Sequence, residues 1–253
     1  MIIPELHNVN LCKEGSLTIH IDRTHDLSFC WVPPGSFLMG SANSEHGHED
    51  SESPQHRVVI SRGFRMSCTT ITNNLWSALM GVSSIAEPSR GEHPVTDVNW
   101  HDVQRFIERL SGEHTQFSFR LPTEAEWEYA CRAGTTARYS SGENEDDLGH
   151  SGWYAGNSNG MTHPVRNRAP NAWGFYDMHG NVFELCQDWD GPYSAGEQKN
   201  PTGPASGEKR ILRGGCFKCP PSYCRSANRY SAPPERRAPN FGFRVVLGAE
   251  RAG

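Results

Sequence analysis

Glycine and proline recur along the whole chain, and they constrain its fold more than any other feature. The 253 residues include 25 glycines and 17 prolines, spread over the full length instead of gathered in a linker. Both residues interrupt regular elements and favour turns. The sequence therefore predicts a chain that turns often and carries little regular secondary structure, without a repeat of fixed period.

Three helices are predicted against this background. Each begins after a side chain that can cap a helix N-terminus and carries apolar residues at helical spacing. The third has the most complete signal, because Thr123 and Glu126 can form a capping box. The expected caps and stops are Thr72 with Gly81, Asn99 with Asp102, and Thr123 with Gly134.

Short strands are predicted at residues 29–32, 57–60, 210–212 and 243–247, with long turn-rich stretches between them. A compact domain tolerates such stretches when they are functional or pinned, for instance by a metal ion. Residues 41–53 are rich in serine, histidine and acids, so we expect an exposed, mobile acidic loop there.

The charge balance and the hydropathy limit the partners of the chain. Asp+Glu number 29 against 24 Lys+Arg, which does not favour nucleic acid. No run approaches the roughly 18 apolar residues of a membrane span, and the N-terminus lacks a basic segment followed by an apolar core. We expect a cytoplasmic monomer that binds neither nucleic acid nor membrane.

Three of the eight cysteines fall within nine residues, at Cys216, Cys219 and Cys224. In a reducing compartment, free thiols or a metal site are expected in preference to a disulfide framework. Thiolates this close suit Cu(I) or Zn(II). A cluster of small buried side chains or a single disulfide is the alternative, and Cys131 and Cys186 are expected to be buried and inert.

Arginine is dense after residue 205. These side chains could form an anion-binding rim on an acidic protein, or they could hold loops together through carbonyls and carboxylates. The residues are Arg210, Arg213, Arg225, Arg229, Arg236, Arg237 and Arg244.

Seven segments, read in order, resemble the formylglycine-generating enzyme or sulfatase-modifying factor family. The resemblance covers residues 28–248 and implies an α+β, single-domain C-type-lectin-like fold, preceded by an N-terminal extension at residues 1–27 and followed by a tail at 249–253. The segments are residues 33–41, 54–58, 93–100, 120–129, 171–182, 213–215 and 242–244.

Among the activities of this family, the cysteine spacing favours a copper-dependent oxidase. In these enzymes the copper-binding cysteines lie four and nine places after a Gly-Gly pair, and those places hold Cys219 and Cys224 after Gly215. With O₂, the enzymes oxidise a cysteine of a protein substrate to formylglycine during sulfatase maturation. Cys216 stands where the oxidases carry a serine and offers a third thiolate. We expect the sulfurs of Cys219 and Cys224 to lie close together in a surface groove.

A structural Ca²⁺ site is also implied, at Asp177, Gly180, Val182 and Glu184. Ca²⁺ takes six to eight oxygen ligands, and two acids separated by a glycine turn can wrap one ion. The alternative is a turn whose acids accept hydrogen bonds from neighbouring amides.

The second interpretation of function is a noncatalytic member of the same fold that binds a ligand or protein, such as a diversified variable protein. Residues 216–223 and 230–240 lie between matched anchors, which suits the display of variable contacts. Phe217, Tyr223 and Tyr230 would supply aromatic contacts.

Overall fold

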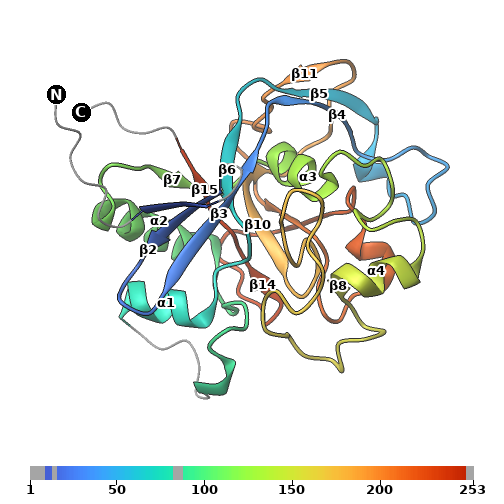
Figure 1. Ribbon diagram of the computed structural model, residues 1–253. Helices are drawn as coiled ribbons and strands as arrows, with labels where there is room; N and C mark the ends of the chain where they lie inside the picture. The colour runs from blue at the N-terminus through green and yellow to red at the C-terminus, as the bar shows by residue number, and fades with distance from the viewer. Residues whose placement is uncertain (1–8, 13–15, 82–87, 249–253) are drawn as a thin grey trace.

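The largest sheet combines strands from both ends of the chain. The computed structural model describes residues 9–12, 16–81 and 88–248. Every pair of neighbouring strands in this sheet is antiparallel. In spatial order the strands are β1 (Val9–Cys12), β2 (Ser16–His20), β3 (Asp26–Val32), β6 (Phe64–Ser67), β15 (Val246–Leu247) and β7 (Phe119–Arg120). Because β2 pairs with β3, part of the predicted N-terminal extension belongs to the main sheet (Figure 1).

A second sheet lies at the centre of the molecule in Figure 1. Its strands, in order, are β13 (Arg229–Ala232), β12 (Arg210–Arg213), β10 (Phe183–Trp189) and β14 (Phe241–Gly242). The strand predicted at 243–247 is wrong in its bounds. Residues 243–245 instead link β14 in this sheet to β15 in the main sheet.

Smaller sheets complete the framework. The predicted strand at 57–60 is confirmed within one of them, and that at 29–32 is confirmed within β3. The strands are β4 (Gly35–Met39), β5 (His56–Ile60) and β11 (Gln198–Lys199) in one sheet, and β8 (Gly152–Trp153) with β9 (His179–Gly180) in the other.

All three predicted helices are confirmed as α1 (Asn73–Met80), α2 (Trp100–Glu113) and α3 (Glu124–Arg132). Their N-termini begin after Thr72, Asn99 and Thr123, each of which accepts a backbone N–H in the first turn. The structure adds α4 (Glu145–Ser151) and the 3-10 helices η2 (Asp50–Glu52), η3 (Pro88–Arg90) and η4 (Pro221–Cys224). Among the described helices, none has the length and apolar character needed to cross a bilayer.

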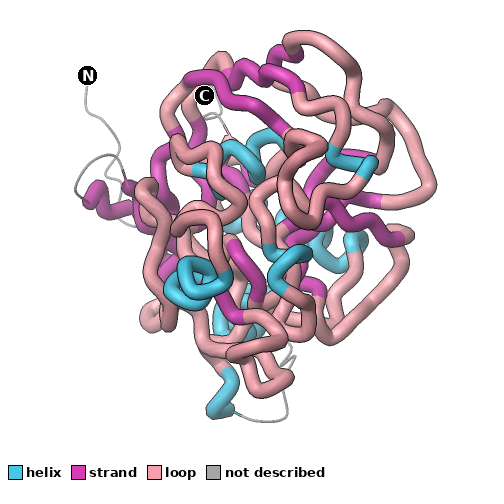
Figure 2. Tube along the Cα trace, turned by 90° about the vertical axis from the view of Figure 1, so that its right-hand side faces the viewer, coloured by secondary structure: helices cyan, strands magenta, loops and turns pink. Residues whose placement is uncertain are grey.

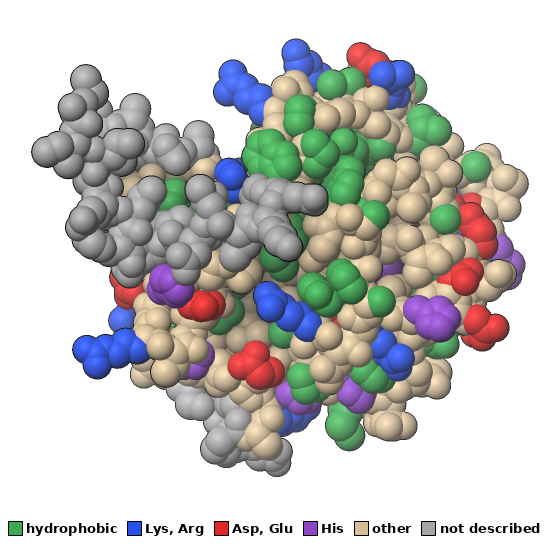
Figure 3. Space-filling view, viewed as in Figure 1, with side chains coloured by type: hydrophobic (Ala, Val, Ile, Leu, Met, Phe, Trp, Pro, Cys, Tyr) green, Lys and Arg blue, Asp and Glu red, His purple; other side chains and the backbone are tan. Residues whose placement is uncertain are grey.

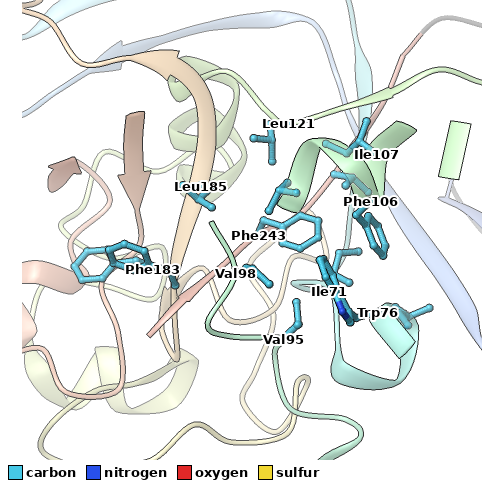
Figure 4. Close-up of a cluster of buried hydrophobic side chains, with 14 of the residues drawn as sticks. Ile71, Trp76, Val95, Val98, Phe106, Ile107, Leu121, Phe183, Leu185 and Phe243 are labelled. Carbon is cyan, nitrogen blue, oxygen red and sulfur yellow. The ribbon is translucent and has the colours of Figure 1, made fainter. Parts of the chain in front are cut away.

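Aromatic packing around Phe243 joins the helices to the sheets (Figure 4). Trp76 of α1 stacks on Phe106 of α2 with ring centroids 5.5 Å apart. The fully buried ring of Phe243 meets Phe106 edge-on at 5.2 Å. Such pairs add about 0.5–1.5 kcal/mol beyond the burial of their area. The link between the two sheets therefore passes through the centre of the core.

Buried arginines hold the loops that occupy much of the chain in Figure 2. Arg213, Arg225 and Arg244 have no exposed surface, and each is ion-paired with a glutamate. Of the two interpretations of the arginine-rich segment, loop anchoring is confirmed for these three side chains. On the face shown in Figure 3, the remaining charges of both signs are scattered.

The loop predicted at residues 41–53 is exposed in part, as expected, but buried side chains anchor it. Glu52 is fully buried, and its two oxygens accept hydrogen bonds from Arg225 at 2.5 and 2.8 Å. Ser41 donates to the same carboxylate, and Glu45 binds Arg225 at 2.6 Å. A buried guanidinium has to keep its counter-charges, and this requirement fixes the acidic loop.

We expect Arg225→Met to destabilise the protein by about 3–5 kcal/mol, because it leaves the Glu52 carboxylate buried and unpaired. Arg57→Met is the matched control: its partner is Glu197, both side chains are about 60 % exposed, and such pairs contribute less than about 1 kcal/mol. Urea unfolding measures both variants. Equal losses in the two variants would contradict this role of Arg225.

Candidate functional site

The cysteine-rich segment begins with a left-handed turn after β12. Gly214 and Gly215 have φ values of 93° and 74°, a region that favours glycine. A Cβ on Gly215 would lie 2.7 Å from both the Cys224 sulfur and the Tyr223 carbonyl. The glycine pair therefore permits the chain to pass directly over Cys224.

Arg213 closes this segment into a loop. Its guanidinium donates hydrogen bonds to the carbonyls of residues 226–228, including one of 2.7 Å to Ala227. The same group pairs with the buried carboxylate of Glu128 on α3. Both ends of the cysteine loop, residues 214–225, are thus held by one buried cation.

All three thiols of the loop are buried, but the contact between them differs from the expected one. The sulfurs of Cys216 and Cys219 lie 2.8 Å apart, whereas the sulfur of Cys224 lies under Gly215. Cys219 has 9 % of its surface exposed, Cys216 1 % and Cys224 none. The close thiol pair thus includes Cys216, the residue that replaces the serine of the oxidases.

Hydrogen bonding and burial shift the pKa values of these thiols in different directions. The hydrogen bond from Cys219, helped by one from Asn240, lowers the pKa of Cys216. The same contact and burial raise the pKa of Cys219 well above its usual range, and the nearby Cys224 adds to this shift. Burial raises the pKa of Cys224. In the metal-free protein, the pair therefore favours one shared proton.

His179 of β9 supports the backbone at Cys224. Its Nε2 lies 2.9 Å from the backbone N–H of Ser140, which can only donate, so Nε2 accepts and Nδ1 carries the proton. That Nδ1 donates to the Cys224 carbonyl at 2.8 Å. Burial lowers the pKa of His179 to about 4. Nothing in the spacing of the histidines marks this residue in the sequence.

Asp177 carries a buried oxygen without a partner. Its Oδ2 accepts the backbone N–H of Arg166 at 3.0 Å, while Oδ1 has no hydrogen-bond partner. Burial, together with the charge of Glu184, raises the pKa of Asp177 to about 6. An unpaired carboxylate oxygen beside a second carboxylate fits an oxygen-seeking cation.

Glu184, the second predicted acidic ligand, is largely committed to protein partners. It accepts hydrogen bonds from Trp127 and from two nitrogens of Arg244, all at 2.6 Å. Three of about four lone-pair sites are thereby used. In the part of the chain that the structure describes, no three His, Cys, Asp or Glu side chains converge on one point. A cation there would need backbone carbonyls, such as those predicted at Gly180 and Val182.

The two predicted sites adjoin each other. The N–H of Gly180 donates to the Gly214 carbonyl at 2.6 Å, and the N–H of Phe217 donates to the Asn181 carbonyl at 3.0 Å. Together with His179, these bonds place the Asp177–Glu184 turn directly against the cysteine loop.

Comparison with known proteins decides the family. The model of the sulfatase-modifying factor enzyme 1-like domain matches residues 21–249. The chain belongs to the sulfatase-modifying factor family. It is 30 % identical to a formylglycine-generating enzyme of Streptomyces coelicolor, covering 87 % of this chain and 88 % of that protein.

Other proteins similar to this chain are not named formylglycine-generating enzymes. A serine/threonine-protein kinase, pkn1, of Chlamydia caviae is 39 % identical over 87 % of this chain, which spans 38 % of the kinase. Variable protein 1 of Treponema denticola superposes with a TM-score of 0.81 at 27 % identity, over 91 % of this chain and 98 % of that one. The single-domain C-type-lectin-like α+β fold is thereby confirmed.

Of the aromatic residues expected to contact a partner, only Tyr223 has the exposure for it, at 37 %. Phe217 is buried, and Tyr230 is half-buried and stacks on Phe183 with centroids 4.9 Å apart. The prediction that Phe217 offers a surface contact is wrong, because its backbone is drawn inward by Asn181.

The structure also contains a cavity of about 410 Å³ that the sequence analysis missed. Its wall includes Tyr193, whose hydroxyl donates to Glu124, and Arg229, which binds the same carboxylate at 2.7 and 2.9 Å. His56 and Trp189 also line it. These residues come from distant segments, so no local pattern announces the cavity.

A pH titration tests the environment of His179. Between pH 4 and 6.5 the unfolded chain binds a proton at this residue and the folded protein does not. Neutral His179 therefore contributes fully to the stability of the fold above about pH 6.5. As the pH falls toward 4, the free energy of unfolding decreases by roughly 3 kcal/mol relative to that of His179→Gln. Urea unfolding of both proteins across this range measures it, and a difference that stays constant with pH would contradict the assignment.

Proposed function

We propose that the protein is a formylglycine-generating-type oxidase that acts on a cysteine of a protein or peptide substrate. The observation that supports this proposal is the loop closed by Arg213, which contains Cys219 and Cys224 four and nine residues after Gly215. The similarity to the Streptomyces coelicolor enzyme over 88 % of its length supports the proposal.

The thiols fit the chemistry of Cu(I), because thiolate sulfur is a soft ligand. Cys219 and Cys224 would hold the ion, and Cys224 lies near enough for its charge to affect the pKa of Cys219. When bound, Cu(I) would supply the reactivity toward O₂ and the substrate thiol. Because both thiols favour the protonated form, we expect copper binding to release protons and to strengthen as the pH rises.

The residues around the loop would position the substrate. Cys219 is the most exposed of the three thiols, and Tyr223, which precedes Cys224 in the sequence, is exposed. Neutral His179 holds the backbone of Cys224 through its carbonyl. A substrate peptide would therefore reach the site from the side of Cys219 and Tyr223.

Copper binding and turnover test the oxidase proposal. We expect Cys219→Ser to weaken Cu(I) binding by more than about a hundredfold, since loss of even an outer-shell group costs ten- to a hundredfold. It should also abolish oxidation of a Cys-X-Pro-X-Arg peptide, which mass spectrometry detects as loss of sulfur. Cys30→Ala is the matched control and should retain both properties, because the buried sulfur of Cys30 contacts Cys68 and the Gly174 carbonyl.

Cys216→Ser restores the oxidase-like residue and should preserve turnover, unless Cys216 is itself a ligand, in which case copper affinity falls. The oxidase proposal fails if the copper-loaded wild type leaves the peptide intact and binds copper no more tightly than Cys219→Ser.

We also propose Ca²⁺ as a structural ion at Asp177, Glu184 and the carbonyls of Gly180 and Val182. The unpaired Oδ1 of Asp177 supports this assignment. We expect saturating calcium to raise the thermal midpoint, because an ion at a hundred times its Kd stabilises the native state by about 2.7 kcal/mol. Asp177→Asn should lose this shift, and Asp190→Asn, an exposed acid, should keep it. An unchanged midpoint in chelated wild type after calcium addition would exclude the site.

A noncatalytic binding function is the second candidate. The match to Treponema denticola variable protein 1 over 98 % of that chain favours it, and the 410 Å³ cavity and the exposed Tyr223 are surfaces that it could use. The cytoplasmic location and the monomeric state stay predictions.

A further inference from the structure

The segment Cys216-Phe217-Lys218-Cys219 is a Cys-X-X-Cys sequence whose two sulfurs lie 2.8 Å apart. The N–H of Cys219 donates to the Cys216 carbonyl at 2.9 Å. This bond closes a four-residue turn, in which the first and last Cα atoms lie within about 7 Å. Disulfides span Cα atoms about 4.4–6.8 Å apart, so the turn matches the backbone geometry of a disulfide.

Hydrogen bonds with neighbouring segments also hold this turn in place. The N–H of Phe217 donates to the Asn181 carbonyl at 3.0 Å, and the Phe217 carbonyl accepts from the Ser158 hydroxyl at 2.6 Å. The Cys219 carbonyl accepts from Ala155 at 2.9 Å. These contacts lie where the loop passes beside α4 and β8 (Figure 1). Bond formation would therefore require movement of sulfur atoms and little movement of backbone.

We propose that Cys216 and Cys219 form a redox-active dithiol that closes to a disulfide by exchange with a small-molecule disulfide. A zinc site, the other common role of a Cys-X-X-Cys sequence, needs four ligands. Over the described ranges, no set of three or more His, Cys, Asp and Glu side chains is arranged to supply them.

The exchange is expected to begin at Cys219, the more exposed sulfur at 9 % against 1 % for Cys216. With glutathione disulfide as oxidant, the proton shared by the pair moves to Cys216, the Cys219 thiolate attacks one sulfur, the S–S bond breaks, and one glutathione leaves. Cys216 then attacks the Cys219 sulfur of the mixed disulfide and releases the second glutathione. The proton shared by the pair and one proton from the solvent go to the two glutathione thiolates, and two electrons pass to glutathione.

Oxidation of this pair would have a consequence for the proposed copper site. A disulfide removes Cys219 as a thiolate ligand, so only the reduced protein could load Cu(I) there. This consequence for copper loading rests on the proposed oxidase function, whereas the proposal of a redox-active dithiol is independent of that function.

Peptide mapping of the full chain tests the dithiol. Reduced protein is equilibrated in glutathione buffers of graded redox ratio, quenched by acid, alkylated and digested. We expect the Cys216 and Cys219 peptides to lose two hydrogens in a single two-electron transition. Mapping separates this bond from any formed by Cys30 and Cys68, whose sulfurs lie 2.6 Å apart in another part of the core. Cys216→Ser should stop at mixed glutathionylation of Cys219, and Cys30→Ala should keep the transition of the Cys216–Cys219 pair.

Cys216 and Cys219 that stay alkylatable at every ratio in folded wild type would overturn the proposal. Copper uptake separates the two hypotheses. A disulfide in a protein whose reduced form binds no Cu(I) supports the dithiol and contradicts the oxidase. Tight Cu(I) binding without any disulfide contradicts the dithiol and supports the oxidase.

Discussion

The buried guanidinium of Arg213 is the interaction on which the candidate site depends. A buried cation is costly unless it is ion-paired and hydrogen-bonded. Here the two terminal nitrogens donate to the Glu128 carboxylate and to the carbonyls of residues 226–228, which follow the cysteine loop, and Nε lies 3.8 Å from the Glu124 carboxylate. Arg225 extends the same principle to the acidic loop at 41–53. Ion pairs of this kind supply the rigidity that short strands and frequent turns do not.

The position of the Asp177–Glu184 turn gives the two proposed metal sites a common framework. Backbone hydrogen bonds join Gly180 to Gly214 and Asn181 to Phe217, and His179 reaches Cys224. A cation that stiffened the turn would also restrain the thiols. We thus expect calcium binding to affect the thiols through these three short contacts, although the two sites share no ligand.

The sequence allowed the helices and the gathering of thiols to be predicted because their signals are local. Thr72 and Thr123 cap helices through residues only three places away. The strand β10 escaped prediction because it is buried on both faces and shows no alternation. The anchoring of the acidic loop was missed because Glu52 finds its partner 173 residues away. Likewise, the spacing after Gly215 does not show which sulfur contacts Cys219. The turn that begins at Cys216 brings the Cys216 sulfur to it.

The strand β15 has a consequence for synthesis of the chain. It lies between β6 and β7, and its two residues provide the pairing between them in the main sheet. Until residues 246–247 leave the ribosome, the facing edges of β6 and β7 remain open. Open edges can pair with other chains, and late, long-range closure slows folding. The nascent protein is therefore expected to be most exposed to aggregation just before β15 inserts.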